Sequence, residues 1–71
     1  MTREAYEELS AELKQKIEVE RPRLAARLKA AIELGDLSEN ADYAAAKEAQ
    51  GFLEGRIQEL QTMLRDAVII D

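Results

Sequence analysis

The chain has 71 residues, a net charge of −5, one proline, and neither cysteine nor histidine. This length allows one domain, and the missing residue types exclude disulfides, thiolate metal sites and histidine bases. No apolar run approaches the roughly 20 residues of a membrane span, and the charged start MTREAYEEL has no signal-peptide pattern. We therefore expect a cytoplasmic protein without a membrane partner, rich in the residues of long helices and coiled coils.

Residues 2–34 form the first predicted helix, because their apolar side chains recur at helical spacing. The apolar positions follow two heptad registers offset by one residue, with Tyr6, Leu9 and Leu13 in one and Ile17, Leu24, Leu28 and Ala31 in the other. The offset lies close to Pro22, which removes a backbone donor and clashes with the preceding turn. We predict a kink or local unwinding near residues 17–22.

A turn at residues 35–38 follows, since Gly35 comes directly after the first periodic segment and permits a left-handed backbone. Asp36 or Ser38 then offers an oxygen to cap the next helix. The charge pattern changes sharply here. From Lys14 to Lys29 there are six bases and two acids, whereas residues 30–46 contain four acids and no base. The chain thus presents an acidic end next to a basic belt.

The acidic end has two compatible interpretations. Asp36 and Glu39 match the D-x-x-E capping box, and acids at a helix start face the positive end of its dipole. Capping alone does not explain why Glu33 and Asp42 crowd the same end. Exposed carboxylates also suit magnesium, which takes one or two from a protein and shares its other positions with water and phosphates. Such an end could complete a site whose other ligands belong to a partner.

The second predicted helix covers residues 39–67. Its apolar positions keep one heptad seam, interrupted only by Gln50, through Tyr43, Ala46, Leu53, Ile57, Leu60, Leu64 and Ala67. Folding back at the turn pairs Leu28 with Ala46 and Tyr6 with Ala67. Gly51, Phe52 and Gly55 then lie opposite the offset, and we interpret them as room for the distorted part of the first helix. The expected fold is all-α, a long antiparallel two-helix coiled-coil hairpin without a pocket for a small-molecule substrate.

The stretch GDLSENADYAAAKEAQGFLEGRIQELQ, residues 35–61, strongly resembles the tip and second helix of bacterial transcript-cleavage factors of the Gre type. The match continues to AVIID and upstream through ERPRLAARLKAAIELGD, and MTREAYEEL resembles a slightly shortened opening segment. The resemblance implies a helical hairpin that enters the secondary channel of bacterial RNA polymerase. The polymerase itself then cleaves backtracked nascent RNA near its 3′ end, which frees the arrested complex. The resemblance therefore implies that the chain is not an enzyme.

By resemblance, Asp36 and Glu39 are the two acids that help hold a catalytic magnesium ion. That ion is shared with the polymerase active site and is not bound stably by this chain alone. Ser38, Asn40, Asp42 and Tyr43 complete the tip, with Asp at position 42 where the family usually has Glu. Arg23, Arg27 and Lys29 are candidate contacts to RNA or the channel wall; the alternative is a solvated helix face with i,i+4 pairs.

The family also has a C-terminal domain of FKBP-like fold, which this chain lacks. We interpret residues 1–71 as the N-terminal coiled-coil domain, and a natural short protein is the alternative. Two other functions stay open. An inhibitory Gre homologue would occupy the same channel and block it, and a structural coiled-coil module would be indifferent to changes in its acidic turn.

Overall fold

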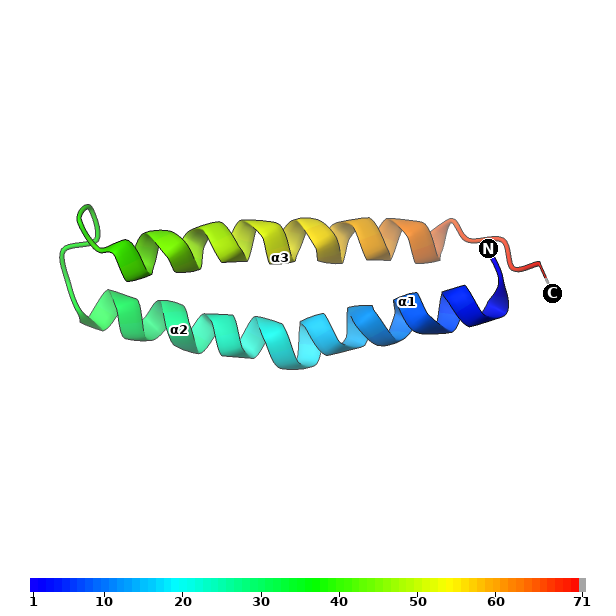
Figure 1. Cartoon of the computed structure of the whole chain (residues 1–71), viewed down its shortest axis with the longest axis horizontal. Coiled ribbons are helices and arrows are strands. Elements are labelled where there is room, and N and C mark those ends of the chain that lie inside the picture. The colour runs from blue at the N-terminus through cyan, green and yellow to red at the C-terminus, as the bar shows by residue number, and fades with distance from the viewer. Residues whose placement is uncertain (71) are drawn as a thin grey trace.

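The computed structural model describes residues 1–70 and shows an antiparallel helical hairpin (Figure 1). Its first arm consists of α1 (Arg3–Gln15), a π-helical segment η1 (Lys16–Glu20) and α2 (Arg21–Glu33). Its second arm is α3 (Ala41–Arg65), which runs back alongside the first. The chain measures 53 × 17 × 13 Å, with the connecting loop at one end and both termini at the other. The all-α hairpin fold is therefore confirmed.

The core is a single seam between the arms. Its fully buried side chains are Ala31, Ala46, Ile57 and Leu60. The other predicted seam positions are half-buried: Tyr6, Leu9, Leu13, Ile17, Leu24, Leu28, Tyr43, Gln50, Leu53, Leu64 and Ala67. The heptad pattern thus identified the buried face of each arm. No helix within residues 1–70 is long and apolar enough to cross a membrane.

The predicted distortion of the first helix is a π-helical turn. The backbone N–H of Arg21 donates to the carbonyl of Lys16, five residues earlier, where an α-helix would bond to the fourth. A π-turn holds one extra residue, which matches the one-residue offset between the two heptad registers. Pro22 lies in the first turn of α2, directly after this wide turn.

The interpretation of Gly51, Phe52 and Gly55 as room for the first arm is wrong. A Cβ added at either glycine would meet nothing within 4 Å, and Phe52 is 74% exposed. Gly51 and Gly55 lie on an exposed face of α3, and Phe52 borders a shallow groove with Lys16 and Glu20 without being buried by the first arm. The first arm instead bows away from α3 around η1, so the distortion is taken up on the solvent side (Figure 1).

The loop between the arms, residues 34–40, is longer than the predicted turn, and neither Asp36 nor Ser38 caps α3. The N-cap is Asn40, whose backbone is extended and whose side-chain oxygen accepts a hydrogen bond from the Tyr43 N–H at 3.0 Å. Asp36 cannot serve because its φ of 40° is left-handed and it lies too early in the loop. Thr2 caps α1 in the same way, accepting from the Ala5 N–H at 3.1 Å.

Candidate functional site at the acidic end

The loop between the arms, which we call the tip loop (residues 34–40), brings the two predicted key acids together. Gly35 and Asp36 have φ values of 83° and 40°, so the chain reverses direction directly after α2. The backbone N–H of Glu39 then donates to the carbonyl of Asp36 at 3.1 Å and closes a four-residue turn. Asp36 and Glu39 consequently stand at the two ends of one tight turn.

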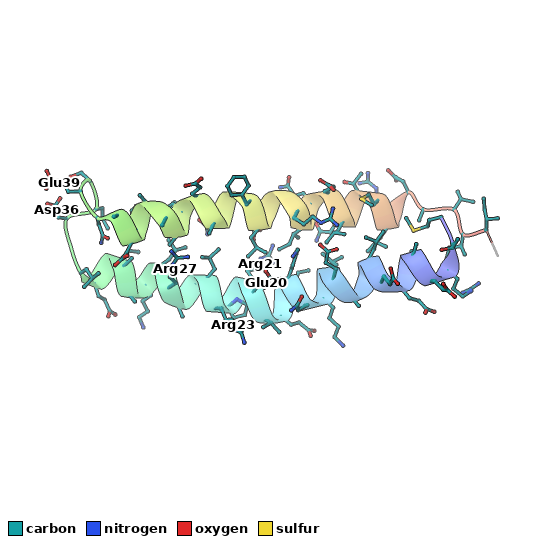
Figure 2. The ribbon with its side chains drawn as sticks, viewed as in Figure 1. Glu20, Arg21, Arg23, Arg27, Asp36 and Glu39 are labelled. Carbon is teal, nitrogen blue, oxygen red and sulfur yellow. The ribbon has the colours of Figure 1, made fainter. Side chains whose placement is uncertain are left out.

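Both acids are exposed, and Figure 2 shows them at the far end of the rod, beyond the start of α3. The Ser38 hydroxyl donates to Asp36 Oδ1 at 3.0 Å, which orients one carboxylate oxygen and leaves the other open. No base lies between residues 30 and 46 to neutralise these charges. The tip loop can therefore present carboxylate oxygens to a cation or a hydrogen-bond donor from outside.

Asn40 connects three parts of the chain. Its Nδ2 donates to the Ala31 carbonyl at 2.7 Å and to the Gly35 carbonyl at 3.3 Å, while its Oδ1 caps α3. Its side chain is half-buried, unlike its neighbours in the loop. The end of α2, the reversal at Gly35 and the start of α3 are thus joined through one amide.

The other residues of the predicted tip motif lie at the start of α3. Asp42 is exposed in the first helical turn, where its charge faces the positive end of the helix dipole. Tyr43 is half-buried in the seam and supplies the N–H that Asn40 caps. Tyr43 therefore belongs to the framework beneath the loop, whereas Asp42 adds to its surface charge.

The tip loop does not form a complete metal site by itself. Within residues 1–70, no group of three or more acidic, histidine or cysteine side chains is arranged to hold a metal ion. Asp36 and Glu39 could supply oxygen ligands to magnesium, which accepts a small number of carboxylates when water and phosphates fill its other positions. Any such ion would need ligands from another molecule.

The bases of the basic belt fall into two groups. We call a base tied when it has an ion-pair partner among the described residues, and untied when it has none. Arg21 forms a two-pronged hydrogen bond to Glu54 of α3, at 2.9 and 2.6 Å, and Lys16 lies within ion-pair distance of Glu12 and Glu20. Arg23, Arg27 and Lys29 have no ion-pair partner among the residues that the structure describes, so the i,i+4 pairs of the alternative interpretation are absent there.

The three untied bases do not share one face. Arg23 and Arg27 line a shallow groove together with Glu20 and Leu24 of the first arm and Ala49 and Leu53 of α3. Lys29 lines a different groove, on the side of Arg21 and Glu54. Figure 2 shows Arg23 and Arg27 along α2, well back from Asp36 and Glu39. Of these three bases, Arg23 and Arg27 therefore offer a partner two neighbouring positive charges, beside Glu20, which is paired with Lys16.

Two cross-arm ion pairs hold the rod and lie outside the tip. The Arg56 guanidinium donates to both oxygens of Glu12, at 2.8 and 3.0 Å. This hydrogen bonding lowers the pKa of Glu12 and raises that of Arg56. The Arg21 pair lowers the pKa of Glu54 for the same reason. These pairs join the first arm to α3 and lie outside the tip loop.

Comparison with known proteins decides the family. The model of the N-terminal part of the GreA and GreB transcription elongation factors matches residues 1–69. The chain belongs to the GreA/GreB family. Transcription elongation factor GreA of Pelobacter propionicus is 54% identical over all 71 residues, and GreA of Thermodesulfovibrio yellowstonii is also 54% identical. GreA of Staphylococcus epidermidis is 48% identical over the same length.

This chain spans 45% of the length of each of these relatives. The GreA/GreB resemblance seen in the sequence is thus confirmed for the hairpin, together with a place among transcription elongation factors.

The sequence did not identify Asn40 as the cap of α3. Asparagine is among the best N-cap residues, and its position two residues before Asp42, an acid suited to the first helical turn, was the available signal.

Proposed function

We propose that this chain is the channel-entering hairpin of a Gre-type elongation factor and that its tip stimulates RNA cleavage by bacterial RNA polymerase. The observation that carries the proposal is the placement of two exposed carboxylates, Asp36 and Glu39, at the ends of one turn on a 53 Å rod. In a full-length factor, residues 1–71 would form the N-terminal domain, followed by a domain of FKBP-like fold. The factor works in the bacterial cytoplasm.

The shape of the rod suits delivery of a charge into a narrow space. Its cross-section is 17 × 13 Å, and its tip loop is separated from its termini by the full length of the hairpin. The secondary channel of the polymerase is the proposed place of entry. Inside it, Asp36 and Glu39 would add carboxylate oxygens to ligands supplied by the polymerase and the RNA.

Magnesium is the cofactor that these oxygens would hold, and when bound it lowers the pKa of a coordinated water and stabilises charge on the reacting phosphate. The carboxylates of Asp36 and Glu39 would contribute oxygen ligands to this ion, and the polymerase and the RNA would supply the others. In this proposal the polymerase is the enzyme. The tip only activates its hydrolysis of backtracked RNA.

The untied arginines supply a second contact. Arg23 and Arg27 lie one helical turn apart and border the same groove, a spacing that lets two guanidinium groups meet successive phosphates. We assign them to the nascent RNA near its 3′ end. Lys29, which borders the opposite groove, is assigned to the channel wall.

The test replaces both acids by their amides. Residues 1–71 are grafted in place of the matching segment of the full-length Pelobacter propionicus relative, so that weak binding of an isolated hairpin does not hide the chemistry. Asp36→Asn with Glu39→Gln should abolish stimulated cleavage by stalled bacterial polymerase. Both changes keep side-chain size, and neither acid caps α3, so the melting temperature should stay close to the parental value.

Different outcomes identify the other candidate functions. Cleavage at the parental rate by the double variant, across a magnesium titration, would contradict the assignment of the two acids. A parental hairpin that binds polymerase and slows elongation without promoting cleavage would indicate the inhibitory homologue. A parental hairpin that neither binds nor alters cleavage would favour the structural coiled-coil module.

A further inference from the structure

We propose that Asn40 is the positioning residue of the tip: its side-chain amide fixes the turn that carries Asp36 and Glu39, and stimulated cleavage depends on that fixation. This inference rests on the proposed function and assigns Asn40 a part in it. Asn40 would not touch the metal or the RNA. It would act through the backbone on either side of the two acids.

The hydrogen bonds of Asn40 reach both ends of the tip loop. Its amide nitrogen holds the carbonyls of Ala31 and Gly35, and its amide oxygen holds the N–H of Tyr43. Ala31 is a buried core residue, 2% exposed, so the amide is anchored to the buried seam next to the loop. The loop is therefore tied to the core through this one side chain.

The two acids lie next to the groups that the amide holds. The Gly35 carbonyl belongs to the peptide plane that joins Gly35 to Asp36, so holding this oxygen restricts the backbone of Asp36. On the other side, Glu39 is bonded directly to Asn40, whose own backbone is fixed as the cap of α3. The restriction matters most at Asp36, whose left-handed φ of 40° is tolerated by aspartate but is a minor conformation for an L-residue.

Among the side chains that commonly cap helices, asparagine alone carries both the oxygen and the NH₂ group that these contacts need. Aspartate and serine also cap helices, but neither carries an N–H₂ group that can donate to the Ala31 and Gly35 carbonyls. An aspartate would instead place a carboxylate against two carbonyl oxygens. The structure therefore separates two roles of Asn40, since capping needs the oxygen and positioning needs the nitrogen.

Asn40→Asp tests the positioning role while keeping a good cap. In the grafted full-length factor, we expect the rate of cleavage at saturating factor to fall roughly 10- to 100-fold, the effect of a small displacement of aligned groups. The factor concentration that gives half the maximal rate should stay near the parental value, because the binding surface along the arms is unchanged. Asn40→Ala, which removes both roles, should lower the cleavage rate and the melting temperature.

Two matched controls accompany these variants. Thr2→Ala removes the equivalent cap of α1 at the opposite end of the rod, so it should lower the melting temperature and leave cleavage at the parental rate. Ala41→Asp adds one negative charge beside Asn40 on an exposed position and keeps the amide, so it should also leave cleavage near the parental rate. If Ala41→Asp reduces cleavage as much as Asn40→Asp, the effect is one of charge and the inference is wrong.

A measurement on the 71-residue chain tests, independently of cleavage, whether Asn40 fixes the tip loop. The backbone ¹⁵N order parameters of residues 35–39 should fall from about 0.85 toward 0.6 or below in both Asn40 variants, and Thr2→Ala should not change them. Unchanged order parameters in both variants would overturn the inference even if cleavage were lost. If the parental factor fails to stimulate cleavage, the proposed function fails, and the order parameters alone decide whether Asn40 holds the acids.

Discussion

At the scale of single residues, the three glycines of this chain differ in whether the fold requires them. Gly35 has a φ of 83°, a conformation that a side chain resists, and it reverses the chain after α2. Gly51 and Gly55 lie within α3, and a Cβ at either would meet open space. The first glycine is therefore required by backbone geometry, whereas the other two weaken the helix without any close contact that demands them.

This difference predicts stability changes of opposite sign. Gly51→Ala and Gly55→Ala should each raise the free energy of unfolding by up to about 1 kcal/mol, the difference in helix propensity between the two residues. Gly35→Ala should lower it by about 1–2 kcal/mol, the cost of a left-handed conformation for an L-residue. Urea denaturation followed by circular dichroism measures all three. A loss of stability in Gly51→Ala would reveal a packing role that the exposed face of α3 does not show.

At the scale of an element, the π-helical segment η1 reconciles two demands on the first arm. The residues before and after it use heptad registers that differ by one residue, and a wide turn absorbs the extra residue. Pro22 follows directly, and in a regular α-helix its ring would clash with the carbonyl four residues earlier. The segment thus lets one continuous arm pack along its whole length against a straight partner, α3.

The register and the proline can be separated by a deletion. Removing Val19, which is 37% exposed, eliminates the extra residue and forces a regular α-helix. With Pro22 present, the deletion should cost about 3 kcal/mol of unfolding free energy, the penalty of an interior proline. In a Pro22→Ala background the deletion should cost much less, and Pro22→Ala alone should be tolerated. Thermal unfolding of the parental chain, the Val19 deletion, Pro22→Ala and the combined variant measures these costs. Equal costs of the deletion in both backgrounds would show that the proline does not require the wide turn.

At the scale of the whole molecule, a thin seam and cross-arm ion pairs hold the two arms of the rod together. Two arms alone bury few side chains fully, so polar contacts across the seam contribute to keeping the arms in register. Glu12 with Arg56 and Arg21 with Glu54 join the first arm to α3 on either side of η1. Both pairs are accessible to solvent, so salt screens them and their contribution to stability is modest.

The ion pairs predict a dependence of stability on acid. The pKa values of Glu12 and Glu54 lie below the ordinary value of 4.5 in the folded chain, chiefly because of hydrogen bonds from Arg56 and Arg21. A lowered folded pKa gives stability that is present above about pH 4.5 and is lost as the pH falls through the folded values. The melting temperature should therefore decrease on acidification below that pH, and less so in the Glu12→Gln and Glu54→Gln variants.

Glu48→Gln provides the control for this measurement. Glu48 is exposed on α3 and has no ion-pair partner among residues 1–70, so its replacement should leave the acid-induced decrease in melting temperature unchanged. The decrease should also become smaller in high salt, because screening weakens the pairs at neutral pH. An identical decrease in the parental chain and in both ion-pair variants would show that other groups cause it.

The sequence by itself determined the two arms, the face that each arm buries and the position of the irregular turn. These features follow from heptad spacing and from Pro22, and they are local properties of the chain that any antiparallel pairing must satisfy. The resemblance of residues 35–61 to the GreA/GreB family added the expectation of a functional acidic tip. The match of residues 1–69 confirmed the family.

Only the tertiary structure decided which loop residue caps α3, which bases are tied and which way the α3 glycines face. Asp36, Ser38 and Asn40 are all residues suited to capping, and the folded loop selects Asn40, whose backbone is extended at the start of α3, whereas the backbone of Asp36 is left-handed and earlier in the loop. Arg21 is tied and Arg23 is not because Glu54 of the other arm lies beside only one of them. Such contacts depend on the angle and offset between the arms, which spacing along one chain does not encode.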